Sequence, residues 1–121
     1  MESLSKGKAA CKHALGRIYS RHEFYSMWPD WLKSTETGHF LELYLYNEEL
    51  GIAVEYYDQQ HYKYIPSFHK NGMSDFENQV RTDNCKINLC DENGVWLIVV
   101  PYNVPVNKIE SYIRHYLPEK C

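Results

Sequence analysis

The chain has 121 residues, a formal charge of −3 and 44% hydrophobic residues, which fits one globular domain over residues 1–121. It has no run of about 18 apolar residues, so no membrane span is expected, and its N-terminus lacks the apolar stretch of a secretory signal. The acidic total excludes a uniformly basic protein, so a nucleic-acid-binding surface has to be local. We therefore expect an intracellular protein, in the cytoplasm or the nucleus.

Basic residues are concentrated near the N-terminus. Apolar residues spaced three to four apart predict a helix over residues 7–19. From Lys6 to Arg21 the chain contains cations and no acid. Such a segment suits phosphate contacts, and the candidate DNA-binding residues within it are Lys8, Lys12, Arg17 and Arg21. The alternative is an ordinary solvated helix face.

Two strands are predicted in the middle of the chain. Residues 20–38 form a connection rich in aromatic residues, and residues 39–47 then alternate as a strand does. A turn over residues 47–51 leads into a second strand, Ile52–Tyr57, rich in β-branched and aromatic residues. A third short strand is expected over residues 61–65, before Pro66.

The two strands carry acidic residues where a strand would usually be apolar. If the turn is centred on Glu48-Glu49, Glu42 lies opposite Glu55, with their Cβ atoms about 5 Å apart. Two carboxylates at that separation suit Mg²⁺, which prefers oxygen ligands. The alternative is that Glu42 faces solvent at a sheet edge.

The second half predicts helix, strand and helix. Ser74 and Glu77 have the spacing of a capping box, opening a helix that runs to about Glu92 and ends at Asn93-Gly94. The apolar run 95–100 predicts a strand buried on both faces, and a last helix covers roughly residues 104–117. The order α-β-β-(β)-α-β-α indicates an α/β or α+β sandwich with a central mixed sheet.

One face of the helix after Ser74 is partly polar. Gln79, Asp83 and Lys86 follow at i, i+4 and i+7 and overlap the apolar stripe. Polar groups on a stripe that faces the core need partners, and a carboxylate of the sheet would suit Lys86. The alternative is a structural ion pair between Asp83 and Lys86.

The four cysteines are Cys11, Cys85, Cys90 and Cys121. None forms a CxxC pair and no histidine stands at zinc-finger spacing. We expect reduced thiols, as in intracellular proteins.

Several short motifs follow one another in a fixed order from the N-terminal half to the end of the apolar run: Trp28-Pro29-Asp30-Trp31-Leu32, Leu41-Glu42-Leu43, Tyr46-Asn47, Ala53-Val54-Glu55-Tyr56, Gln60-His61-Tyr62, Gln79, Asp83, Lys86, Leu89-Cys90, Gly94-Val95 and Leu97-Ile98-Val99-Val100-Pro101-Tyr102. Together they resemble the motifs of the PD-(D/E)XK nuclease superfamily. More narrowly, they resemble the very-short-patch-repair-like and restriction-endonuclease-like proteins common in large DNA viruses.

The resemblance implies a restriction-endonuclease-like core and a Mg²⁺- or Mn²⁺-dependent DNA endonuclease, with Glu55 as metal ligand and with Lys86 and Gln60 as helpers. The chain departs from the pattern in both strands. Tyr44 stands where the family has a metal-binding Asp and Leu45 where it has a Gly, and in the second strand Tyr57 replaces an Asp and Asp58 a Gly. Glu42 is the candidate replacement ligand and Asp58 a weaker one.

Three functions follow from these residues. The first is a metal-dependent endonuclease with a degenerate site, in which His61 contacts phosphate or orients water. The second is an inactive relative that keeps the fold to bind DNA or a protein. The third is a small interaction protein in which Glu42 and Glu55 merely pair with basic side chains. Many members of the superfamily dimerise, so a homodimer is possible.

Overall fold

A computed structural model describes residues 5–118 of the chain. Three α-helices and four β-strands follow in the order α1 (Lys6–Ile18), β1 (Tyr25–Met27), β2 (Leu43–Asn47), β3 (Ile52–Tyr57), α2 (Met73–Glu92), β4 (Trp96–Pro101) and α3 (Ile109–Tyr116). Two short 3₁₀ helices, η1 (Gln59–His61) and η2 (Val106–Lys108), precede α2 and α3. Cys121 lies outside the described residues, and the three other cysteines are free thiols.

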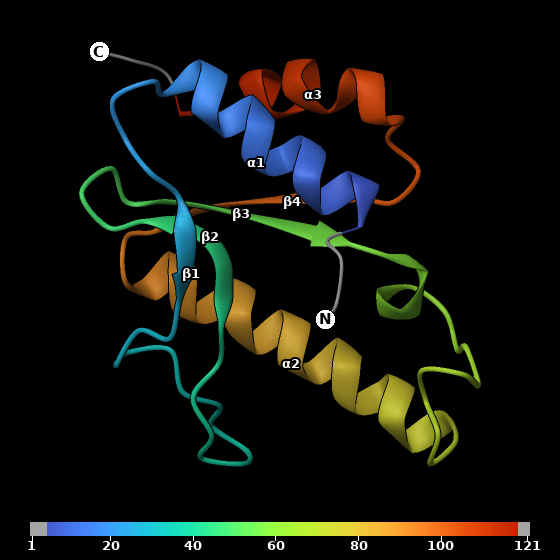
Figure 1. The fold of residues 1–121 in the computed structure, drawn as a ribbon. Helices are drawn as coiled ribbons and strands as arrows, with labels where there is room; N and C mark the ends of the chain where they lie inside the picture. The colour runs from blue at the N-terminus through green and yellow to red at the C-terminus, as the bar shows by residue number, and fades with distance from the viewer. Residues whose placement is uncertain (1–4, 119–121) are drawn as a thin grey trace.

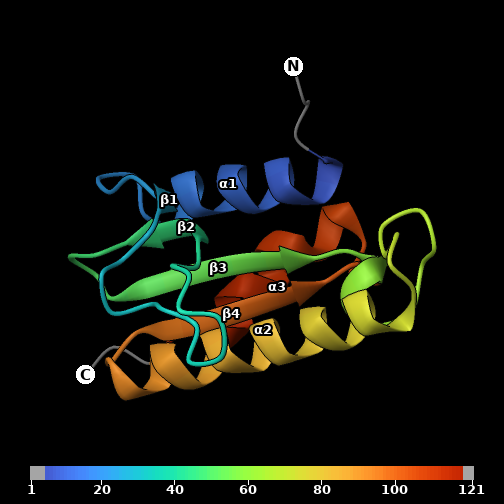
Figure 2. The ribbon, with the colours of Figure 1, turned by 90° about the horizontal axis from the view of Figure 1, so that it is seen from below.

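The strands form one mixed sheet in the order β1-β2-β3-β4. β1 to β3 are antiparallel neighbours, whereas β4 runs parallel to β3, because α2 carries the chain back between them. Figures 1 and 2 show α1 and α3 on one face of the sheet and α2 on the other. The expected α+β class with a central mixed sheet is confirmed.

Each face of the sheet has its own apolar core. On the side of α1 and α3, buried residues of both helices meet inward-facing residues of β2, β3 and β4, such as Leu15, Val54 and Ile113. On the side of α2 a smaller cluster includes Leu43, Ala53 and Cys90. Among the described residues, no helix is long and apolar enough to cross a bilayer.

The strands differ from the expected ones at three places. β1, within the predicted connection 20–38, was missed because a strand of three residues has no measurable alternation. The expected strand 61–65 does not form: the Asp58 carboxylate accepts a hydrogen bond from the Gln59 N–H at 3.1 Å and caps the 3₁₀ helix η1. The strand predicted over 39–47 is shorter and begins at Leu43.

Helix starts also differ. α2 begins at Met73, after Gly72 with φ of 88°, so Ser74 lies inside the helix and the predicted capping box is wrong. Asp75 supplies a substitute, because its carboxylate accepts a hydrogen bond from the Asn71 N–H at 3.0 Å. The predicted end at Asn93-Gly94 is confirmed, whereas the last helix is divided into η2 and α3.

β4 is one of the two edge strands of the sheet, and burial on both of its faces is incomplete. Ile98 and Val100 are buried, but Trp96 is 49% exposed. The Trp96 indole N–H donates to the Tyr116 carbonyl at 2.8 Å, which explains how a large ring is held at the surface.

The hairpin register differs from the expected one by two residues. Tyr46, rather than Tyr44, pairs with Ala53, so Glu42 does not lie opposite Glu55. The register between β1 and β2 also shifts, since Tyr25 pairs with Tyr46 but Met27 pairs with Leu43. β2 thus contains one extra residue, a β-bulge, and bulges redirect side chains.

Candidate functional site

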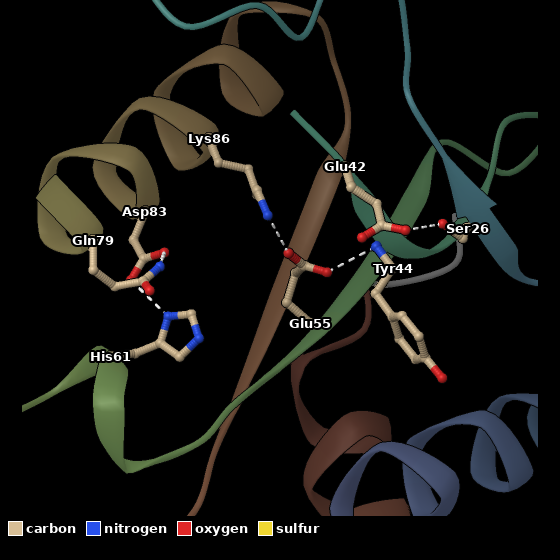
Figure 3. A network of polar contacts seen from close by, with 8 residues as sticks. All are labelled: Ser26, Glu42, Tyr44, Glu55, His61, Gln79, Asp83 and Lys86. Carbon is tan, nitrogen blue, oxygen red and sulfur yellow. Dashed lines mark hydrogen bonds and ion pairs between the residues drawn. The ribbon is translucent and has the colours of Figure 1, made fainter. Parts of the chain in front are cut away.

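A row of polar side chains lies between β3 and α2, where an apolar layer would be expected. We call it the polar row and define it as Glu55 from β3, His61 from η1, and Gln79, Asp83 and Lys86 from α2 (Figure 3). Glu55 and Asp83 are 6% and 7% exposed. Because burying a charge is unfavourable unless it is paired, the partners of these groups define what the site can do.

Lys86 and Glu55 form the central pair of the row. The Lys86 Nζ donates to Glu55 Oε1 at 2.5 Å, and the side chains are only 13% and 8% exposed. The second oxygen of Glu55, Oε2, accepts a hydrogen bond from the Tyr44 backbone N–H at 2.9 Å. The predicted contact between Lys86 and a sheet carboxylate is therefore present, and both oxygens of Glu55 have a donor.

Tyr44 meets Glu55 through its backbone only. Its ring packs on the α1 side of the sheet together with Leu45, whereas Leu43 and Tyr46 belong to the α2 side. The Lys8 Nζ lies 5.2 Å from the centre of the Tyr44 ring, and Figure 3 shows the ring directed away from Glu55. Because of the bulge in β2, the side chain at position 44 points away from Glu55. This is the position at which the resemblance implies a metal-binding Asp.

Glu42 precedes β2 and is half-buried. Its carboxylate accepts a hydrogen bond from the Ser26 hydroxyl of β1, whereas the Tyr44 amide donates to Glu55 (Figure 3). The two carboxylates are therefore bound by different groups instead of standing directly opposite each other. The expected direct pairing is wrong because the register is shifted.

The other end of the row is organised by Asp83. One carboxylate oxygen lies 2.8 Å from His61 Nδ1, and the other accepts a hydrogen bond from the Gln79 amide at 3.2 Å. Asp83 thus binds a histidine of η1, whereas the alternative drawn from the sequence paired it with Lys86. A carboxylate on Nδ1 fixes the orientation of the imidazole ring.

Tyr57 is a buried residue of the site that sequence reasoning treated only as a departure from a motif. It lies two residues after Glu55 on the same strand face, and its ring stacks on His61 with centroids 4.2 Å apart. Its hydroxyl is buried without a hydrogen-bond partner among the described residues. Burial, and then the Asp83 and Glu55 carboxylates, raise the pKa of this phenol. Strand alternation alone could have placed it here.

One predicted metal ligand and one predicted helper lie outside the row. Asp58 uses its carboxylate to cap η1, and Gln60, in the middle of η1, is half-buried. Neither side chain has a hydrogen bond to the polar row within residues 5–118.

The acidic residues predicted to hold a divalent metal are each bound by another group in this structure. Nowhere in the described part of the chain do three or more His, Cys, Asp or Glu side chains gather closely enough to hold a metal. Of the three candidate ligands, Glu55 is paired with Lys86, Glu42 is bound by Ser26, and Asp58 caps η1. Mg²⁺ sites in proteins use carboxylates that are free to accept the ion.

The candidate DNA-binding residues do not form one surface. Lys8, Lys12 and Arg17 belong to α1, and Arg21 follows it, whereas α2 lies on the other face of the sheet (Figure 1). His61, the fifth candidate, is on that other side, bound to Asp83 of α2. Arg17 is neutralised by Glu110 of α3, with the Nε and Oε1 atoms 2.5 Å apart. Lys12 and Arg21 are exposed.

Comparisons with known proteins find viral relatives. Protein 094L of Frog virus 3 (isolate Goorha) is 40% identical over 115 residues, which are 95% of this chain and 72% of that protein. Protein 033L of Invertebrate iridescent virus 3 is 35% identical over 90% of this chain and 55% of its own length. Protein 307L of Invertebrate iridescent virus 6 is 47% identical over 74% of this chain and 46% of its own length. All three are described as uncharacterized.

The chain spans about half the length of the two iridescent-virus relatives. No family model and no solved structure matches it. With 40% identity along 72% of the Frog virus 3 protein, the chain belongs to the family of viral proteins that includes protein 094L of Frog virus 3.

Proposed function

We propose that the chain is a nucleic-acid-binding module with a restriction-endonuclease-like core, in which an ion pair replaces the metal-binding acidic pair. The element order α-β-β-β-α-β-α and the mixed sheet agree with the core that the sequence resemblance implies. Fold alone does not define function, so the proposal depends on the site.

The observation that carries the proposal is the state of Glu55. Its two oxygens accept from the Lys86 ammonium and the Tyr44 amide, so binding a cation would require at least the ammonium to leave. If Lys86 lost this contact, its buried ammonium would have no partner, and an unpaired buried charge typically destabilises a protein by about 3–5 kcal/mol. The site is therefore better suited to hold β3 on α2 than to bind Mg²⁺ or Mn²⁺.

The nucleic-acid contacts are assigned to the outer surface of α1. Lys6, Lys12 and Arg21 are exposed, and the sequence from Lys6 to Arg21 contains no Asp or Glu. Lys8 is half-buried against Tyr44, and Arg17 is paired with Glu110, so both contribute less. A local basic strip of this kind attracts phosphates even on a protein of net negative charge.

A second candidate is the metal-dependent endonuclease. It is favoured by two carboxylates in one region of the sheet, Glu55 of β3 and Glu42 just before β2 (Figure 3), of which Glu55 could accept a cation if Lys86 released it. An intracellular location and a homodimer remain predictions under either function.

The two functions are separated by a binding and cleavage assay on the purified chain. Labelled duplex DNA is titrated with protein at low and moderate salt, with EDTA or with Mn²⁺. We expect binding in EDTA that weakens as salt rises, because released counterions drive it, and intact DNA in Mn²⁺.

Lys12→Glu and Arg21→Glu should weaken binding. Lys33→Glu is the matched charge control, because it makes the same change of charge at an exposed lysine outside α1. Lys33 lies in the connection between β1 and β2, and this connection contacts α2 through an ion pair between Glu36 and Arg81.

Mn²⁺-dependent cleavage that disappears in Glu55→Gln and Glu42→Gln would replace the proposal with the endonuclease. Absence of binding to both duplex and single-stranded DNA at low salt would overturn both candidates. In that case the remaining function is the interaction protein, in which Glu55 and Lys86 only stabilise the fold.

A further inference from the structure

The connection between β3 and α2 combines exposed aromatic rings with lysines. We call residues 59–72 the aromatic loop; Figure 1 shows it extending beyond the end of β3, past η1. Tyr62, Tyr64 and Phe68 are 47%, 39% and 61% exposed. Lys63 and Lys70 alternate with these rings, and the loop contains no Asp or Glu.

Two of the exposed rings, Tyr62 and Tyr64, pack against other aromatic rings of the protein. Tyr62 packs on Tyr102 with centroids 5.7 Å apart, and the Lys63 Nζ lies 5.7 Å from the centre of the Tyr102 ring. Tyr64 stacks on His69 at 5.8 Å with an interplanar angle of 28°. Rings that are already positioned lose little conformational entropy when a flat ligand adds to the stack.

His69 holds the aromatic loop in place. It is only 3% exposed, its Nδ1 accepts a hydrogen bond from the Ile65 N–H at 2.9 Å, and it packs edge-on against Phe76 of α2. Phe68, next to this anchor, leaves most of its surface in solvent. These contacts of His69 fix the position of the backbone from which the exposed rings project.

Within residues 5–118, the two acids that flank the aromatic loop in sequence form no ion pair with its lysines. The flanking carboxylates, Asp58 and Asp75, accept hydrogen bonds from the backbone N–H groups of Gln59 and Asn71. Lys63 and Lys70 are both exposed. Exposed rings with adjacent cations and no acid match the two parts of an unpaired nucleotide, its base and its phosphate.

We propose that the aromatic loop is a stacking platform for unpaired bases, so that the ligand of this surface is single-stranded nucleic acid, DNA or RNA. The inference rests on the proposed nucleic-acid-binding function and adds a second surface to the basic strip of α1. Bases of a duplex are stacked inside it and offer no free face to these rings. An aromatic ring paired with one base contributes about 1–3 kcal/mol to binding.

The test uses the full chain and labelled oligonucleotides of about 20 nucleotides, oligo(dT) and oligo(U), beside a duplex of equal length. We expect Phe68→Leu and Tyr64→Ala each to weaken single-strand binding by about tenfold, since one stacked base is lost. Phe68→Trp should retain binding, because a flat ring stacks and an aliphatic side chain does not. The two oligonucleotides distinguish DNA from RNA.

Phe40→Ala is the matched control. Phe40 is 48% exposed and, like Tyr102, has a lysine near its ring, with the Lys33 Nζ 5.5 Å from the centroid, but it lies outside the aromatic loop. Its loss should leave single-strand binding unchanged. Unaltered circular dichroism and melting temperature in each variant show that the comparison is between folded proteins.

Single-strand binding that survives both Phe68→Leu and Tyr64→Ala overturns the stacking platform. If duplex binding still depends on Lys12 in that experiment, the proposed function stands and only this inference fails. If neither the oligonucleotides nor the duplex bind at low salt, the proposed function fails and this inference fails with it.

Discussion

The Lys86 ammonium of α2 lies 2.5 Å from Glu55 Oε1 of β3, and this contact joins the helix to the middle of the sheet (Figure 3). The pair is almost fully buried and the other Glu55 oxygen is bound by the Tyr44 amide. A buried pair is sensitive to the loss of one member, because the remaining charge keeps its desolvation cost without a partner.

Lys86→Met should therefore lower the free energy of unfolding by about 3–5 kcal/mol. The double variant Lys86→Met/Glu55→Gln should recover a large part of that loss, since the glutamine side chain is neutral and its amide oxygen can still accept from the Tyr44 N–H. Urea unfolding of the four proteins of this double-mutant cycle measures the coupling. Independent, additive effects of the two changes would show that the ion pair is not a stabilising unit.

Tyr44→Asp should not create a metal site. The side chain at position 44 points to the α1 side of the sheet, so the new carboxylate would replace a packed ring without approaching Glu55. We expect no binding of Mn²⁺ by isothermal titration calorimetry and a loss of stability of about 1–3 kcal/mol. Mn²⁺ binding that Glu55→Gln abolishes would mean that the bulge in β2 moves when Tyr44 is removed.

Two glycines of α1 should respond oppositely to alanine. A Cβ added to Gly7 would overlap the Tyr56 ring, whereas one added to Gly16 meets nothing within 4 Å. Gly16→Ala should stabilise the protein by about 0.5–1 kcal/mol through helix propensity. Gly7→Ala should destabilise it by more than about 1 kcal/mol, the usual range for overpacking.

Thermal and urea unfolding of both variants test this close approach of α1 to β3. Gly7→Ala combined with Tyr56→Leu should recover part of the loss, since the smaller side chain makes room for the Cβ. Equal stabilisation by alanine at positions 7 and 16 would contradict the packing of Gly7 on Tyr56.

Tyr57→Phe removes a buried hydroxyl that has no partner among the described residues. An unsatisfied buried polar group typically costs about 1–3 kcal/mol, so this variant should unfold at a higher urea concentration than the unmodified protein. Tyr112→Phe is the control, because its hydroxyl donates to the Val99 carbonyl at 3.3 Å and its loss should be destabilising. A less stable Tyr57→Phe would indicate a hidden hydrogen-bond partner for the phenol.

Stability should fall in alkaline solution. Burial raises the pKa of the Cys11 thiol to about 12 and that of the Cys90 thiol to about 11, whereas a thiol in an unfolded chain has a pKa of about 8.5. Above that pH the unfolded state binds fewer protons than the folded state, so the free energy of unfolding decreases as pH rises. The full contribution of both thiols is present below about pH 8.

The measurement is the urea midpoint at several pH values from neutral to strongly alkaline. Cys90→Ala should reduce the steepness of the decline, whatever its effect at neutral pH. A midpoint that stays constant up to the folded-state pKa of Cys90 would contradict burial of the thiols.

Local patterns predicted the parts of the site that depend on one element. Alternation placed Glu55 within β3, and helical spacing directed Lys86 toward the sheet, where the structure confirms their contact. The turn between β2 and β3 and the end of α2 at Gly94 were also predicted, because both depend on residues adjacent in sequence.

The remaining features depend on how elements pair. The bulge that turns the Tyr44 ring away exists only because β1 pairs with β2, and a strand as short as Tyr25–Met27 carries no pattern of its own. Asp83 could have paired with Lys86 on its own helix, but η1 brings His61 to it instead. The sequence by itself thus determined which acids and bases face the interior, since side-chain periodicity is local. Only the tertiary structure decided which of them meet, because register, bulges and helix docking arise from the packing of the whole sheet.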